Sequence, residues 1–214
     1  MTRLRAFGRA SSGASAAEFA LVLPLALLLL FGVLDAGRYV WTLNQLEKAA
    51  QMGARYAVST ALVPTGLNSY ETVGLSCPGG TLKPGDRICR EALGAIRCTG
   101  SGGSASCTCE RTPCPDLGTA DGAAFARIVD RMRAITPLLR ADNVTITYSG
   151  SGIGYAGDPG LDDNGDPLSD IAPLVTVEVG GIGLRTMTLF GGSITLPPVR
   201  STLTLEDGDG AKAY

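Results

Sequence analysis

The stretch at residues 14–34 reads ASAAEFALVLPLALLLLFGVL, and it decides how the rest of the chain is organised. Its single charged residue is Glu18, and everything after Glu18 is uncharged. As a helix rising 1.5 Å per residue, these 21 residues extend about 30 Å, the thickness of the hydrocarbon core of a bilayer. The stretch therefore predicts a helix that crosses a membrane once.

The flanking charges predict the orientation of that helix. Arg3, Arg5 and Arg9 precede the apolar run, and no acid comes before Glu18. The positive-inside rule then places the N-terminus in the cytoplasm and the bulk of the chain in the periplasm. A cleaved secretory signal is the competing interpretation, but its apolar core is shorter, roughly 7–15 residues, and no small-x-small cleavage site follows Leu34.

Glu18 is an anomaly in this setting, because an unpaired acid within a membrane helix is costly. One interpretation leaves its carboxylate in the headgroup zone. The other gives it a partner. Gly13 lies five residues earlier, and only small residues separate the two. This spacing is similar to the processing site of type IV pilins, in which a membrane peptidase cuts after the glycine.

Longer motifs extend the resemblance. The segment GASAAEFALVLPL at 13–25, FGVLDAGR at 31–38, NQL at 44–46 and AAQMGARYA at 49–57 resemble the TadE-like family. Residues 201–206 resemble that family's closing strand more weakly. Members are minor pilins or pseudopilins of tight-adherence (Flp-type) pilus systems, a kind of type IV pilus.

The resemblance implies a cut between Gly13 and Ala14. The new amine of Ala14 would lie one helical turn from Glu18, and the paired charges could enter a low-dielectric bundle of helices. Glu18 is thus the expected subunit-packing acid. The implied partners are other pilins or pseudopilins, the pilus assembly platform, the prepilin peptidase and the inner membrane. Incorporation into the pilus follows from the same resemblance.

Composition bears on the remaining function classes. The net charge is −2 and no basic stripe appears, so we expect no nucleic-acid partner. The chain has no histidine, the usual general base, and no nucleotide-binding or nucleophile motif. We therefore expect a protein that is not an enzyme and has no cofactor.

The alternative to a pilin is a bitopic membrane-anchored adhesin or envelope scaffold that keeps its leader uncut.

The helix is expected to continue beyond the membrane. Small or apolar residues recur at spacings of 4 and 3 from residue 39 to residue 57, which indicates one buried helical face. The sequence predicts five segments. They are a cytoplasmic leader at 1–13, a transmembrane helix at 14–37, its extension at 38–63, a Cys-, Gly- and Pro-rich loop region at 64–119, and a helix with antiparallel strands at 120–214.

Six cysteines lie close together in the loop region, and their spacing lacks the paired C-x2-C of a structural zinc site. An even number beyond a membrane segment favours disulfides, with the pairing left open. The disulfide candidates are Cys77, Cys89, Cys98, Cys107, Cys109 and Cys114. We expect irregular loops here, with a short helix within 86–96 and a flexible turn at 99–106.

The last segment predicts the fold. Apolar spacing predicts a helix within 120–140 that Asp121 caps, and alternation predicts strands at 144–148, 174–179, 184–190 and 199–205. The sum is an α+β fold, in which the long helix packs on a small antiparallel sheet. In the acidic stretch 158–170, Asp162, Asn164 and Asp166 form a weak calcium candidate, although a solvated turn fits better because Pro167 replaces the expected glycine. No metal site is otherwise expected.

Overall fold

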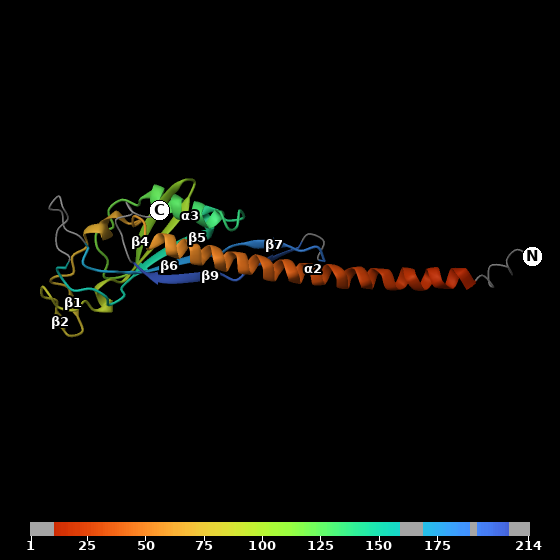
Figure 1. Ribbon diagram of the computed structural model, residues 1–214, viewed down its shortest axis with the longest axis horizontal. Helices are drawn as coiled ribbons and strands as arrows, with labels where there is room; N and C mark the ends of the chain where they lie inside the picture. Colours follow the sequence, from red (N-terminus) through yellow and green to blue (C-terminus); the bar gives the residue numbers. More distant parts are fainter. Residues whose placement is uncertain (1–10, 159–168, 189–191, 206–214) are drawn as a thin grey trace, which may run out of the picture. The chain divides into compact units, whose positions relative to one another are not determined.

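The computed structural model describes residues 11–158, 169–188 and 192–205, with side chains from residue 15 onwards (Figure 1). The chain divides into two compact units. The first contains the described parts of Met1–Leu43 and Gly183–Leu196, and the second contains those of Asn44–Ile182 and Pro197–Tyr214. The long helix α2, Ser11–Ala57, contributes to both units.

Five antiparallel strands form the main sheet, in the order β4-β3-β5-β6-β9. Their bounds are β3 Ala95–Ser101, β4 Ser104–Arg111, β5 Val144–Ser149, β6 Leu174–Val179 and β9 Val199–Thr204. Buried and partly exposed residues alternate along β5 and β6. Val175, Val177 and Val179 are fully buried, as the alternation predicted. One face of this sheet is therefore the core of the second unit.

Helix α3, Gly122–Arg133, covers this core. Asp121 caps it as predicted, since its Oδ1 accepts hydrogen bonds from the N–H groups of Ala123 and Ala124 at 2.8 and 2.9 Å. The helix contacts β3 through the ring of Phe125, which lies where Gly100 leaves room for it. The apolar stripe predicted for this helix is buried at Phe125, Ile128 and Met132.

The C-terminal end of α2 packs within the second unit. Leu46, Ala50 and Gly53 are buried, which confirms the predicted buried face. A Cβ at Gly53 would lie only 2.6 Å from the Met132 sulfur, so the absence of a side chain allows α2 and α3 to approach closely. The α+β fold predicted from the sequence is confirmed.

The cysteine-rich region differs from its prediction. Residues 95–111 are not irregular loops but the hairpin β3–β4, whose turn uses the positive φ of Gly102 and Gly103. The expected helix within 86–96 is only a 3-10 turn, η2, at Arg90–Ala92. The rest of the region holds the short strands β1, Ser76–Cys77, and β2, Gly80–Thr81, and the 3-10 turn η1, Thr65–Ser69. A further 3-10 turn, η3, Ala141–Asn143, precedes β5.

The strand expected at 184–190 does not join the main sheet. Instead β7, Gly183–Arg185, pairs with β8, Ser193–Thr195, in a separate hairpin of the first unit. In Figure 1, β7 runs beside α2. This hairpin brings residues far along the chain to the end of the apolar run.

Candidate membrane and assembly site on the long helix

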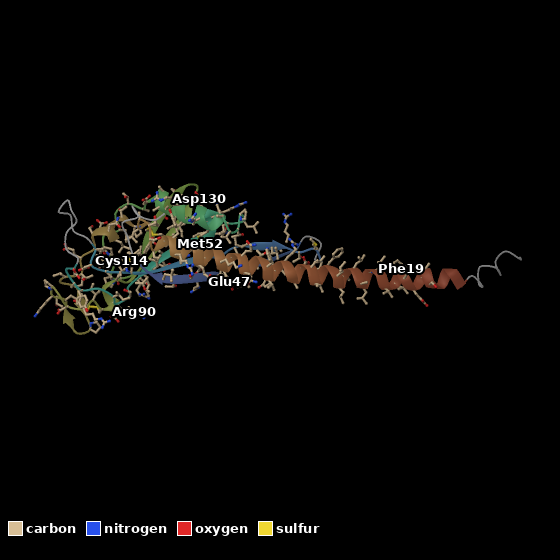
Figure 2. The ribbon with its side chains drawn as sticks, viewed as in Figure 1. Phe19, Glu47, Met52, Arg90, Cys114 and Asp130 are labelled. Atoms are coloured by element: carbon tan, nitrogen blue, oxygen red, sulfur yellow. A yellow bond between two sulfur atoms is a disulfide. The ribbon has the colours of Figure 1, made fainter. Side chains whose placement is uncertain are left out.

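The N-terminal half of α2 exposes apolar side chains on every side. Phe19, Leu21, Leu25 and Leu29 are between 65% and 80% exposed, and none of the helix's most apolar window is buried. Figure 2 shows side chains projecting all around the ribbon near Phe19. Among the described residues, this is the one helix long and apolar enough to cross a membrane. A helix that is apolar all round is typical of a membrane span, and by its length and composition this one suggests a single-pass anchor.

All three residues predicted for processing and packing lie in α2. Gly13 is within the helix, and so is Ala14. Glu18 lies one turn further on and is exposed. An amine created at Ala14 would be four residues, or about 6 Å of helical rise, from the Glu18 position. That separation is compatible with an ion pair on one helix or between neighbouring helices.

The end of the apolar run carries a second acid, Asp35, which is 8% exposed. Its carboxylate accepts hydrogen bonds from the backbone N–H of Met187, at 2.8 and 3.0 Å, and from that of Thr188, at 2.9 Å. The Thr188 hydroxyl donates a further bond at 2.9 Å. These donors come from the turn that follows β7, so Asp35 fastens that turn to α2.

Arg38 extends the same contact. Its guanidinium lies 3.4 Å from an Asp35 oxygen and donates a hydrogen bond to the carbonyl of Arg185 at 3.2 Å. The carboxylate thus has a cation beside it and four donated hydrogen bonds from the turn. Charge-assisted bonds of this kind satisfy a buried acid that would otherwise be costly.

The sequence of this part of α2 matches a known protein family. Residues 13–55 match the family model described as "TadE-like protein". This segment is a TadE-like domain. No curated protein and no solved structure matches the chain.

The TadE-like domain contains the predicted processing and packing residues, Gly13, Ala14 and Glu18, and also Asp35. It begins at the proposed cleavage site and ends near the end of α2. The similarity to TadE-like proteins is thus established for residues 13–55 alone. The cysteine hairpin, α3 and the whole main sheet lie outside the match, so the family comparison does not extend to them.

The six cysteines form three disulfides within the second unit. They join Cys77 to Cys89, Cys98 to Cys107 and Cys109 to Cys114. Cys98 and Cys107 are directly opposed in the β3–β4 register. No cysteine is left as a thiol. The three bridges thus cross-link the β3–β4 hairpin and the loops beside it in the second unit.

The acidic stretch separates into two parts. Asp162, Asn164 and Asp166, the calcium candidates, lie outside the described residues. Asp170 is described and is buried, with 5% exposure. Its carboxylate accepts bonds from the N–H and hydroxyl of Thr72 and from the N–H of Gly157, at 2.8–3.1 Å. Within the described ranges, no three acids, histidines or cysteines gather to hold a metal.

Sequence reasoning missed the roles of both buried acids. Asp170 looked like one of several acids in a solvated turn, whereas it joins two loops of the second unit. Asp35 entered the sequence analysis only as part of the segment at 31–38 that resembles the TadE-like family. A sequence signal for Asp35 does exist, since an acid directly after an apolar run needs a partner. No local pattern indicates that the partner would be residues 187–188.

Proposed function

We propose that this chain is a minor pilin or pseudopilin that takes part in assembling a tight-adherence (Flp-type) pilus. It is made with a cytoplasmic leader, is cut between Gly13 and Ala14, and stays in the inner membrane with its C-terminal domain in the periplasm. The observation that carries the proposal is the exposed acid Glu18 within a TadE-like domain, one turn from the cut.

The physical reason is charge pairing in an apolar setting. Among the described residues, the Glu18 carboxylate makes no hydrogen bond or ion pair in the single subunit. Cleavage supplies a cation on Ala14 at a distance that suits it. A neighbouring subunit carries the same Ala14 amine and Glu18 carboxylate. Pairing between the two helices then sets the register in which the subunits pack. The exposed apolar surface from Phe19 to Leu34 offers the packing face for other pilins and the assembly platform.

The first experiment maps the mature N-terminus by mass spectrometry in cells with and without the prepilin peptidase. The proposal predicts a chain that begins at Ala14 only when the peptidase is present. A chain that always keeps residues 1–13 would favour the bitopic adhesin or scaffold instead.

The second experiment separates membrane insertion from assembly. Glu18→Gln removes the charge with little change in shape, and Glu47→Gln is the matched control, an exposed acid further along α2. Both variants should reach the membrane fraction. Only Glu18→Gln should lose piliation, and normal piliation in that variant would contradict the pairing.

A further inference from the structure

The hairpin β7–β8 lies along α2 in a defined direction. Three contacts within the first unit establish it. The Arg185 carbonyl meets Arg38, the N–H groups of residues 187 and 188 meet Asp35, and a Cβ at Gly32 would lie 3.9 Å from the Thr188 methyl. As the hairpin chain advances from 185 to 188, its contacts move down α2 from 38 to 32. Residues 186–188 therefore lie progressively closer to the apolar run.

The turn also reaches the level of that run. Gly32 belongs to the uncharged stretch that ends at Leu34, while Asp35 is the first charged residue after it. Residues 14–34 account for about 30 Å, the whole hydrocarbon thickness. Thr188 thus lies beside the last turn of the membrane-spanning segment. If residues 14–34 span the hydrocarbon core, the edge of that core on the Leu34 side lies at the depth of Thr188.

The surface presented at that level suits a membrane. The Met187 side chain is 50% exposed, although it is apolar. Arg38 follows the apolar run on α2 and its side chain is 42% exposed, and Arg185, which precedes Met187 in the hairpin, is exposed too. An exposed apolar residue, followed by two basic residues in the direction away from the apolar run, matches the order of acyl chains and phosphates at a bilayer surface. Asp35 does not disturb this match, because its carboxylate is covered by the turn itself.

We propose that the Met187–Thr188 turn is a second membrane contact, seated at the boundary between headgroups and acyl chains beside the Leu34 end of α2. Its partner is the phospholipid surface: Met187 enters the acyl region, and the two arginines meet lipid phosphates. Asp35 is the positioning residue that holds the turn at this depth. The proposal rests on the single-pass anchor and not on the pilus function, so either can fail without the other.

Methionine oxidation tests the contact in the native sequence. Full-length chain is placed in lipid nanodiscs, one chain per disc, and treated with peroxymonosulfate, a charged oxidant that stays in water. From exposure alone, Met187 at 50% should react at least as fast as Met52 at 37%. The proposal predicts the reverse order, with Met187 oxidised severalfold more slowly. Equal or faster oxidation of Met187 would overturn it.

Two further arms identify the cause of protection. Asp35→Ala should release the turn and raise the Met187 rate to that of Met52 or above, whereas the control Glu47→Ala should leave the order unchanged. If Met187 is protected only in discs that hold two chains, the covering surface is a second copy and the lipid proposal is wrong.

Fluorescence depth measurement provides a second readout. The chain has one tryptophan, so Trp41→Phe gives a dark background for a single probe. A probe at Met187→Trp should be quenched by lipids brominated near the headgroup, with blue-shifted emission. A probe at Thr195→Trp, an exposed position at the far end of the hairpin, should be quenched severalfold less. Equal quenching at the two positions, or none at residue 187, would overturn the proposal.

Discussion

Removing the Tyr148 hydroxyl tests how the segment that follows α2 is tied to the sheet. The hydroxyl of Tyr148, on β5, accepts a hydrogen bond from the N–H of Val63 at 3.2 Å. Both residues are fully buried. The Val63 carbonyl accepts a bond from the Asp121 N–H at 2.7 Å, so this residue connects β5 with the cap of α3. The substitution Tyr148→Phe keeps the ring and removes only the acceptor.

The expected loss follows from the buried N–H that remains. A buried donor without a partner costs about 1–3 kcal/mol, whereas an average hydrogen bond contributes about 1 kcal/mol. The distance of 3.2 Å lies at the long end of the N–H···O range, which favours the lower half of that cost, about 1–2 kcal/mol. For a chain of this size, each kcal/mol lowers Tm by roughly 2–4 °C. The variant should therefore melt about 2–8 °C below the parent.

The assay is thermal unfolding of the full chain in detergent, followed by near-ultraviolet circular dichroism with the disulfides intact. Tyr155→Phe is the matched control, since Tyr155 is 55% exposed. Its substitution should change the free energy of unfolding by no more than about 0.5 kcal/mol. If the two variants melt together, the Val63 bond contributes nothing and this account of the helix connection is wrong.

Three other outcomes can be measured on the same preparation. Burial raises the pKa of the Tyr148 hydroxyl, and burial together with Asp170 raises that of Tyr70. The unfolded chain therefore loses these protons first, so Tm should fall as pH rises above about 10, and less steeply in Tyr148→Phe. Gly53→Ala should lower stability by about 1–3 kcal/mol, because its Cβ would press on the buried Met132 sulfur, whereas Gly37→Ala meets no neighbour and should not. Alkylation without reductant should label none of the six cysteines, and peptide mapping should return the three pairs.

The sequence predicted best where a repeating pattern acts locally. Alternation placed the valines of β6 inward, and an aspartate before an apolar stripe capped α3. The spacing of small residues identified the buried face of α2 at Leu46, Ala50 and Gly53. In each case, the physical cause lies within a few residues of the pattern.

The β3–β4 hairpin was missed because its residues are poor strand formers. Gly and Ser dominate residues 100–106, and such a composition usually indicates a loop. Here Gly100 is needed because the Phe125 ring occupies the space of a side chain, and Gly102 and Gly103 form the turn. The Cys98–Cys107 bridge joins opposed residues of the two strands. Packing and a covalent bond thus override weak strand propensity.

The hydrogen-bond partners of the two buried acids could not be predicted from the sequence. Asp170 and Asp35 each bind backbone N–H groups from distant parts of the chain, with Thr72 and Met187 lying 98 and 152 residues away. Every residue but proline carries an N–H group, so such a partner leaves no trace in the sequence. A carboxylate satisfied in this way has the same sequence signature as a solvated one. Glu18 differs from both because its expected partner is created by proteolysis at a recognisable glycine, and only for such an acid can the sequence propose a partner before a structure is known.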